Sequence, residues 1–221
     1  MNLLAFDTAS EWCTAALWQD GAVAFRAIHA GQTHSDLLLP MLMELLAEAG
    51  FSLKQMDGLA YGMGPGSFTG LRIACGVAQG LALGADLPVL GISTLEALAE
   101  EARQTLGAQA VLACLDARMN EVYAGRYLWS GGNWQCQGGP LVCPPDALPT
   151  VEGAWFGAGS GFAAYPGLAR GLTGARADLL PHARAIAALA AARFVRGEGL
   201  PAEGAEPLYI RDKVARKISE R

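Results

Sequence analysis

The chain has 221 residues, of which 52% are hydrophobic and 17% charged, and it contains 28 glycines. This length fits one large domain or two lobes of about 100 residues each, and the apolar content excludes an intrinsically disordered chain. A formal net charge of −5 disfavours direct, tight binding of a nucleic-acid backbone, for which proteins use basic surfaces.

The first half of the chain predicts an α/β arrangement in which three strands precede alternating helices and strands. Strands are expected at residues 2–6, 12–18, 22–27, 58–61 and 88–92, and helices at residues 36–49, 69–85 and 94–106. Asp36 is the expected N-cap of the first helix. This places Pro40 in the first turn, where its missing N–H breaks no helical hydrogen bond.

The pattern restarts near residue 110. Strands are expected at 110–115, 122–128 and 154–156, with a turn at 130–133, a proline-rich connection at 140–149 and an alanine-rich helix at 183–196. Asp7 and Asp116 each end a buried strand that turns into a hairpin, and each is followed by an acid, Glu11 or Glu121. This weak internal repeat predicts duplicated α/β lobes at 1–106 and 107–221, a cleft between them, and a C-terminal tail that packs back on the N-terminal lobe.

Two kinds of residue could build a nucleotide site in that cleft. Asp7 and Asp116 could order Mg²⁺ and water, or each could simply cap its turn. The glycine-rich loop at 62–70 lies between a strand and a helix, where backbone N–H groups can hold a phosphate, although a tight turn needs the same glycines. It lacks the Lys-Ser/Thr end of a P-loop, and Ser67 stands where the dinucleotide-binding fingerprint has glycine. The candidate cleft residues are Asp7, Thr8, Gly64, Gly66, Asp116, Gly157 and Gly159.

Other catalytic and metal-binding patterns are missing from the sequence. The three histidines form no HExxH or HxxxH pair, so we expect no metal site and no cofactor of the chain's own. Five cysteines without a CxxC pair argue against a disulfide framework. The N-terminus lacks the basic start of a signal peptide, and apolar stretches such as 186–195 are shorter than the ~20 residues that cross a bilayer. We therefore expect a cytoplasmic protein without membrane contacts.

The predicted helices at 36–49 and 69–85 are apolar on two faces, whereas a helix that covers one sheet needs a single apolar stripe. Either a three-layer fold buries both faces, or a partner protein covers the second. The partner interpretation predicts an interface of Leu38, Met41, Leu42, Leu45, Arg72, Ile73, Gly76, Val77 and Gly80. It also predicts that Leu42→Glu or Gly80→Leu breaks the association while the monomer stays folded.

The segment from Tyr61 to Arg72, YGMGPGSFTGLR, resembles a motif of the TsaB (YeaZ) family and is far more specific than a bare glycine loop. The resemblance extends over nearly the whole chain. Further matching segments are FDTA at 6–9, HSDLLLP at 34–40, QGLA at 79–82, GISTL at 91–95, DARMNEVY at 116–123 and PLYIR at 207–211. Members of this family are bacterial partner proteins in the threonylcarbamoyladenosine modification of tRNA.

The resemblance implies a two-lobed, actin-like ATPase-type (ASKHA) fold and a non-catalytic paralogue of TsaD, the enzyme that transfers a threonylcarbamoyl group from its adenylate to a tRNA adenosine. TsaD carries a metal-binding HxxxH, whereas the matching region here, residues 91–97, has no histidine. In the family, the two apolar helices build a bundle with TsaD or, for the protein alone, with a second copy, and the ATPase TsaE joins the pair. ATP and Mg²⁺ then belong to the complex, and tRNA is reached only through it.

Two functions remain open. The first is a scaffold that supports TsaD and has no turnover of its own. The second is a nucleotide-hydrolysing or phosphotransfer enzyme that uses Asp7, Asp116 and the glycine loops. The missing histidines and the missing phosphate-binding lysine favour the scaffold. The basic tail at 211–221 could contact tRNA in the complex or could form a solvated helix end.

Overall fold

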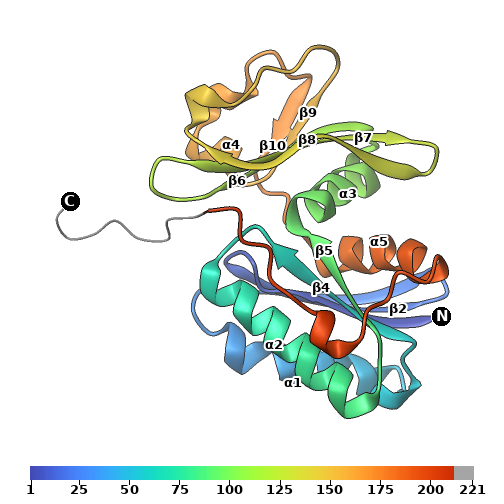
Figure 1. Ribbon diagram of the computed structural model, residues 1–221. Helices are drawn as coiled ribbons and strands as arrows, with labels where there is room; N and C mark the ends of the chain where they lie inside the picture. Colours follow the sequence, from blue (N-terminus) through green and yellow to red (C-terminus); the bar gives the residue numbers. More distant parts are fainter. Residues whose placement is uncertain (212–221) are drawn as a thin grey trace.

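Two five-stranded sheets, one in each lobe, dominate the computed structural model, which describes residues 1–211 (Figure 1). Most of the basic tail, at residues 212–221, lies outside the described residues. The first sheet has the order β3-β2-β1-β4-β5, in which β1, β2 and β3 are antiparallel while β4 and β5 run parallel to β1. Its strands are β1 (Asn2–Asp7), β2 (Trp12–Gln19), β3 (Ala22–His29), β4 (Gly58–Gly64) and β5 (Val89–Ser93).

The second sheet repeats this topology. It has the order β8-β7-β6-β9-β10, again with three antiparallel strands followed by two that run parallel to the central one. Its strands are β6 (Ala110–Asp116), β7 (Val122–Ser130), β8 (Asn133–Cys143), β9 (Phe156–Ala158) and β10 (Gly174–Arg176). Asp7 ends β1 and Asp116 ends β6, the equivalent strand. The predicted two-lobed, actin-like α/β fold with duplicated lobes is therefore confirmed.

Helices cover both faces of the first sheet (Figure 1). α1 (His34–Glu48) and α2 (Phe68–Ala85) pack on one face, and α5 (Ala183–Val195) packs on the other. α3 (Thr94–Leu106) packs against both α5 and the second sheet, and so joins the lobes. The shorter helices are α4 (Gly161–Ala164), η1 (Leu53–Gln55), η2 (Pro145–Ala147), η3 (Pro166–Ala169) and η4 (Ala202–Gly204). The first lobe is thus a three-layer fold.

The core of this lobe follows from the alternation of side chains along β1. Leu4 and Phe6 face α1 and α2, whereas Leu3 and Ala5 face α5, and all four are fully buried. α5 contributes mostly alanines to its side of the core, so its backbone lies close to the sheet. The alanine-rich composition of the predicted helix at 183–196 therefore has a packing role.

The start of α1 differs from the prediction. The helix begins at His34 with Thr33 as its N-cap, three residues before the expected cap, Asp36. Pro40 consequently lies inside the helix, where the carbonyl of Asp36 loses its usual hydrogen-bond donor. Pro40 and Asp36 are both exposed, so water can reach the Asp36 carbonyl that lacks its helical donor.

The second half of the chain contains strands that the sequence analysis missed. β8 extends over residues 140–143 of the predicted proline-rich connection at 140–149, because it is an edge strand, where a proline need not donate to a neighbouring strand. β10 and α4 were also missed, and the strand expected at 154–156 is Phe156–Ala158. The predicted turn at 130–133 is confirmed, with Gly131 and Gly132 at φ of 59° and 81° in the hairpin between β7 and β8.

The C-terminal segment, which was expected to pack back on the N-terminal lobe, crosses from the second lobe to the first. After α5, the chain pairs with β5 through two hydrogen bonds between Val89 and Leu200, of 2.7 and 2.9 Å. Gln79 Nε2 of α2 donates to the Ala205 carbonyl at 2.9 Å, and the Leu208 N–H donates to the carbonyl of Met63. Residues 183–211 therefore belong structurally to the N-terminal lobe.

α2 is long and apolar enough, by length and composition alone, to cross a membrane. This apolar stretch is longer than the one at 186–195. One face of α2 packs on the first sheet through Leu71, Ala74 and Ala78, as the core helix of a globular lobe does.

Candidate functional site

Asp7 lies at the carboxyl end of β1 but does not face open solvent. It is 1% exposed, and its Oδ1 accepts a hydrogen bond from the Ala9 N–H at 3.0 Å. Its Oδ2 has no hydrogen-bond partner among residues 1–211, and Gly62 of β4 lies so close that a Cβ there would overlap it. Burial raises the pKa of Asp7 to about 7, so much of this carboxyl is uncharged near neutrality.

The glycine-rich loop at 62–70 packs against the turn that follows β1. Thr8 Oγ1 donates to the Gly70 carbonyl at 2.7 Å, and the Ser67 N–H donates to the Ala9 carbonyl at 2.8 Å. A Cβ on Gly66 would lie 2.5 Å from the Ala9 carbonyl oxygen, and one on Gly70 would overlap that of Thr8. The space in which a phosphate would lie against these glycines is therefore filled by the chain's own backbone. This agrees with the tight-turn interpretation of the loop.

Gly64 has a structural role of the same kind. Its φ is +117°, a conformation that residues with a side chain rarely adopt, and an added Cβ would lie 2.7 Å from the Leu208 carbonyl oxygen. Ser67 Oγ accepts a hydrogen bond from the Gly70 N–H at 3.3 Å and so caps α2. One of the N–H groups that could have held an anion at this helix end is thereby occupied.

The equivalent residues of the second lobe are also used locally. Asp116 Oδ1 accepts from the Arg118 N–H at 2.9 Å, and its Oδ2 lies 3.1 Å from the Arg118 guanidinium. A Cβ on Gly157 would lie 2.5 Å from the Phe162 ring, and one on Gly159 would lie 2.5 Å from the Cys114 carbonyl oxygen. No hydrogen bond or ion pair between described residues links Asp116 with Asp7. Asp116, like Asp7, therefore accepts a hydrogen bond within the turn that follows its own strand.

Ion pairs span the mouth of the predicted cleft. Arg118 of the second lobe reaches Glu11 of the first at 2.8 Å, and Arg211 reaches Glu121 at 2.6 Å. The turn that carries Arg118 holds three consecutive residues at positive φ, Arg118, Met119 and Asn120, at 59°, 56° and 61°. The sequence analysis noticed Glu11 and Glu121 as part of the repeat but could not pair them with their arginines.

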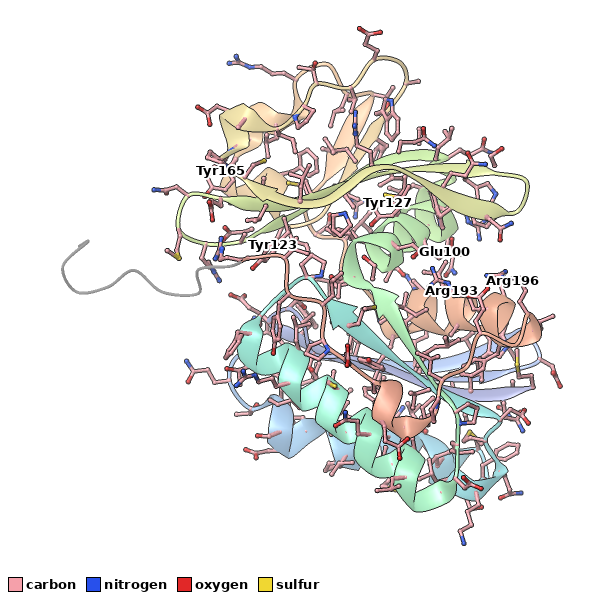
Figure 2. The ribbon with its side chains drawn as sticks, viewed as in Figure 1. Glu100, Tyr123, Tyr127, Tyr165, Arg193 and Arg196 are labelled. Carbon is pink, nitrogen blue, oxygen red and sulfur yellow. The ribbon has the colours of Figure 1, made fainter. Side chains whose placement is uncertain are left out.

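A second set of ion pairs joins the lobes through α3. Glu96 accepts from Arg193 at 2.6 Å, and Glu101 pairs with Arg184. Glu100, only 2% exposed, accepts hydrogen bonds from Arg103, Gln104 and Trp134. Figure 2 shows Glu100 and Arg193 in the region between the two sheets. Each of these carboxylates accepts hydrogen bonds from neighbouring side chains and holds α3 against the elements around it. None of the three is therefore free to act as a catalytic acid.

The two surface hollows of the described residues lie away from the predicted cleft residues. They have volumes of about 480 and 590 Å³ and are lined by residues such as Phe156 and Arg176 in one case and Pro88 and Phe194 in the other. Neither contains a predicted cleft residue. Within residues 1–211, no group of three or more His, Cys, Asp or Glu side chains is placed to hold a metal ion.

The predicted interface divides into buried and exposed halves. Leu38, Met41, Leu42 and Leu45 are at most 3% exposed, because the sheet and α2 cover them within this chain. The prediction that they form a surface is therefore wrong. Arg72, Gly76 and Gly80 are exposed, and Ile73 and Val77 are half-buried.

The apolar surface of α1 comes from residues that the sequence analysis passed over. Leu39 and Met43 are 42% and 43% exposed, and Leu83 of α2 is 72% exposed. Added Cβ atoms on Gly76, Gly80 and Gly84 would meet nothing within 4 Å. We name the exposed set Leu39, Met43, Gly76, Gly80 and Leu83 the helical face. The four-residue spacing of Leu39 and Met43, one turn apart, was a signal for it.

Known proteins share both the sequence and the architecture. The family model of TsaD, described as tRNA N6-adenosine threonylcarbamoyltransferase, matches residues 28–153. A relative from Escherichia coli, named tRNA threonylcarbamoyladenosine biosynthesis protein TsaB, is 42% identical over 98% of this chain and 97% of its own. The chain belongs to the TsaB family. A TsaB of Haemophilus influenzae is 39% identical over 98% of this chain and 96% of its own.

A solved structure extends this likeness to three dimensions. YeaZ from Pseudomonas aeruginosa superposes with a TM-score of 0.90 at 42% identity and covers 94% of this chain and 99% of its own. The likeness thus includes both lobes. The family resemblance of the GPGSFTGLR segment is confirmed, while the roles of the cleft and helical residues stay predictions.

Proposed function

We propose that this chain acts in the biosynthesis of threonylcarbamoyladenosine on tRNA, as a non-catalytic partner of TsaD. In this proposal TsaD carries out the transfer from threonylcarbamoyl-adenylate, TsaE joins the pair, and tRNA contacts this chain only through the complex. The protein is cytoplasmic, and it forms a homodimer when alone. Support comes from the names of the relatives that are 42% and 39% identical over nearly the full chain and from the match to the TsaD family model.

The observation that carries the non-catalytic role is the packing of the glycine loop. Gly62, Gly66 and Gly70 lie against Asp7, Ala9 and Thr8 so closely that no added Cβ fits. A carboxylate that orders Mg²⁺ must be ionised and within reach of the ion. Asp7 is buried, has its pKa raised by that burial, and faces β4. These features count against the alternative, a nucleotide-hydrolysing or phosphotransfer enzyme.

The helical face is the surface that we assign to TsaD. Its residues are exposed, and in α2 Gly76 and Gly80 lie one and two turns after Arg72 of the original prediction. The open glycines of α2 allow another helix to approach the backbone closely. Leu38, Met41, Leu42 and Leu45 support this surface from beneath and do not touch the partner.

Co-purification with TsaD, followed by a tRNA modification assay, tests the proposal. Gly80→Leu places a bulky side chain on the helical face without a clash inside the monomer, and should abolish the complex and the modification. Gly167→Leu in the second lobe is the matched control, because its Cβ is equally unhindered. Intact association of the Gly80→Leu protein with TsaD would show that the assigned surface is wrong.

A nucleotide titration of the isolated protein tests the alternative function. We expect no micromolar binding of ATP in the presence of Mg²⁺. Micromolar binding that disappears in Asp7→Ala would contradict the non-catalytic role and support a working cleft.

A further inference from the structure

The segment at 205–211, which we name the strap, runs past α2 towards the second lobe (Figure 1). Two polar side chains of α2 hold it. Gln79 Nε2 donates to the Ala205 carbonyl at 2.9 Å, and Arg72 Nε donates to the Tyr209 hydroxyl at 3.0 Å. The strap is therefore fixed to α2 near both of its ends.

The end of the strap also contacts the second lobe, through Arg211. Its Nη2 donates to Glu121 Oε2 at 2.6 Å, and its Nη1 lies 3.8 Å from the sulfur of Met119. The guanidinium carbon lies 5.5 Å from the centre of the Tyr123 ring. Only 14% of the Arg211 side chain is exposed. This side chain thus joins a segment held by the first lobe to the turn between β6 and β7.

The turn that Arg211 contacts has an unusual backbone. The three residues at 118–120 have positive φ, at 59°, 56° and 61°. Residues with a side chain are crowded in this left-handed region, so a run of three needs support from its surroundings. Arg118 pairs with Glu11 of the first lobe, and Glu121 pairs with Arg211 of the strap. The conformation of this turn therefore depends on contacts from outside the second lobe.

The strap lies beside the helical face. Arg72 and Gln79, which hold the strap, are almost two turns apart and so lie on one side of α2. Gly76 and Gly80 of the helical face form the neighbouring stripe, about 70° further round the helix at 3.6 residues per turn. A partner helix that packs on these glycines therefore lies next to the strap.

We propose that the strap couples the helical face to the second lobe, so that a partner bound on α2 stabilises the left-handed turn at 118–120. In the proposed function, on which this inference rests, that partner is TsaD. The strap has two states, with Arg211 docked on Glu121 or released from it. A partner that presses the strap against α2 favours the docked state. Because such coupling is reciprocal, loss of the Arg211 contact also weakens binding at the helical face.

Hydrogen exchange of the full chain, with and without saturating TsaD, measures the coupling. The amides of Ala117 and Glu121 donate within the turn, at 3.0 and 3.1 Å, so they exchange when the turn opens. In the parent, TsaD should slow their exchange about threefold or more. In Arg211→Gln the same amides should exchange faster in the free chain and should not slow when TsaD binds.

A second variant removes the contact from the other lobe. Glu121→Gln leaves the strap and α2 unchanged, and should weaken TsaD binding as much as Arg211→Gln does, by about fivefold. The double variant should be no weaker than either single variant, because both replacements remove the same contact. Arg176→Gln is the matched control, since it breaks an exposed ion pair with Asp178 elsewhere in the second lobe, and it should bind TsaD like the parent. Circular dichroism checks that each variant is folded.

Failure of the coupling and failure of the proposed function give different results. Turn amides that slow equally in the parent and in Arg211→Gln would mean that TsaD covers the turn directly, and would overturn the coupling. Additive losses of affinity in the double variant, or TsaD binding that leaves the turn amides unchanged, would overturn it as well. In each of these cases TsaD still binds. A chain that does not bind TsaD would overturn the proposed function together with the coupling.

Discussion

The two lobes share a strand order but differ in how completely it is covered. In the first lobe, strands of five to eight residues lie between α1 and α2 on one face and α5 on the other. In the second, β9 and β10 have three residues each and α4 has four. The two lobes therefore have the same order of paired strands, but β9 and β10 are short and the second lobe has less helical cover. They share this strand order although their hydrophobic cores differ in size.

The largest expected loss of stability comes from a substitution in the core of the first lobe, and a neighbouring surface substitution should cause almost none. Leu42→Glu places a charge at a fully buried position, and should cost about 4 kcal/mol or more, enough to unfold many single domains. This corrects the prediction that the variant stays folded. Leu39→Glu, three residues earlier and 42% exposed, should keep its melting temperature and lose affinity for TsaD. Thermal unfolding of both variants checks the contrast, and a folded Leu42→Glu protein would refute the assigned burial.

Two closely packed glycines, Gly70 in α2 and Gly157 in β9, should respond differently to substitution. Gly70→Ala would overlap the backbone carbonyl of Thr8, which cannot rotate away, and should cost about 3–4 kcal/mol. Gly157→Ala meets the Phe162 ring, a side chain that can shift, and should cost about half as much or less. Calorimetry of the two variants measures the difference. Equal losses would mean that the two glycines are packed equally tightly.

Replacing the two strand-ending acids should have different effects. The pKa of Asp7 is raised to about 7, so its contribution is intact below pH 4 and is lost as the pH rises towards 7 and beyond, by about 4 kcal/mol at pH 8. Asp7→Asn should therefore melt at a higher temperature than the parent at pH 8 and at a similar temperature at pH 4. Asp116→Asn, in the equivalent position of the second lobe, removes the charge that pairs with Arg118 and should not raise the melting temperature. A parent-like pH profile for Asp7→Asn would contradict the burial of this carboxyl.

The smallest expected effect is at the mouth of the cleft. Arg118 and Glu11 are mostly exposed, with 72% and 61% of their side-chain surface accessible. Arg118→Ala should therefore cost less than about 1 kcal/mol. Urea unfolding measures it, and a larger loss would show that this pair holds the lobes together as strongly as the buried acids of α3 do.

Local patterns predicted the first lobe well and the second lobe poorly. Helices α2 and α3 and strands β1, β2 and β6 begin within one residue of expectation, because caps, turns and apolar runs are strong signals there. β8 was missed because its glycines and Pro140 read as a connection, although an edge strand tolerates both.

The candidate site shows a similar division. Asp7 and the glycine loop were found, but a sequence cannot tell whether glycines make room for a phosphate or for the Thr8 and Ala9 carbonyls. Leu38 and Leu42 were taken for surface because the sequence does not show that the sheet and α2 cover them. Leu39 and Met43, on the opposite side, were left out for the same reason.

The central claim is that this chain acts through its outer helical face and not through the cleft between its lobes. One tRNA modification assay, with TsaD and TsaE present, tests it with two variants of this chain. Gly80→Leu should reduce modification to the level without this chain, while Asp7→Asn should retain parental activity. Full activity with Gly80→Leu, together with loss of activity in a folded Asp7→Asn protein, would contradict the account.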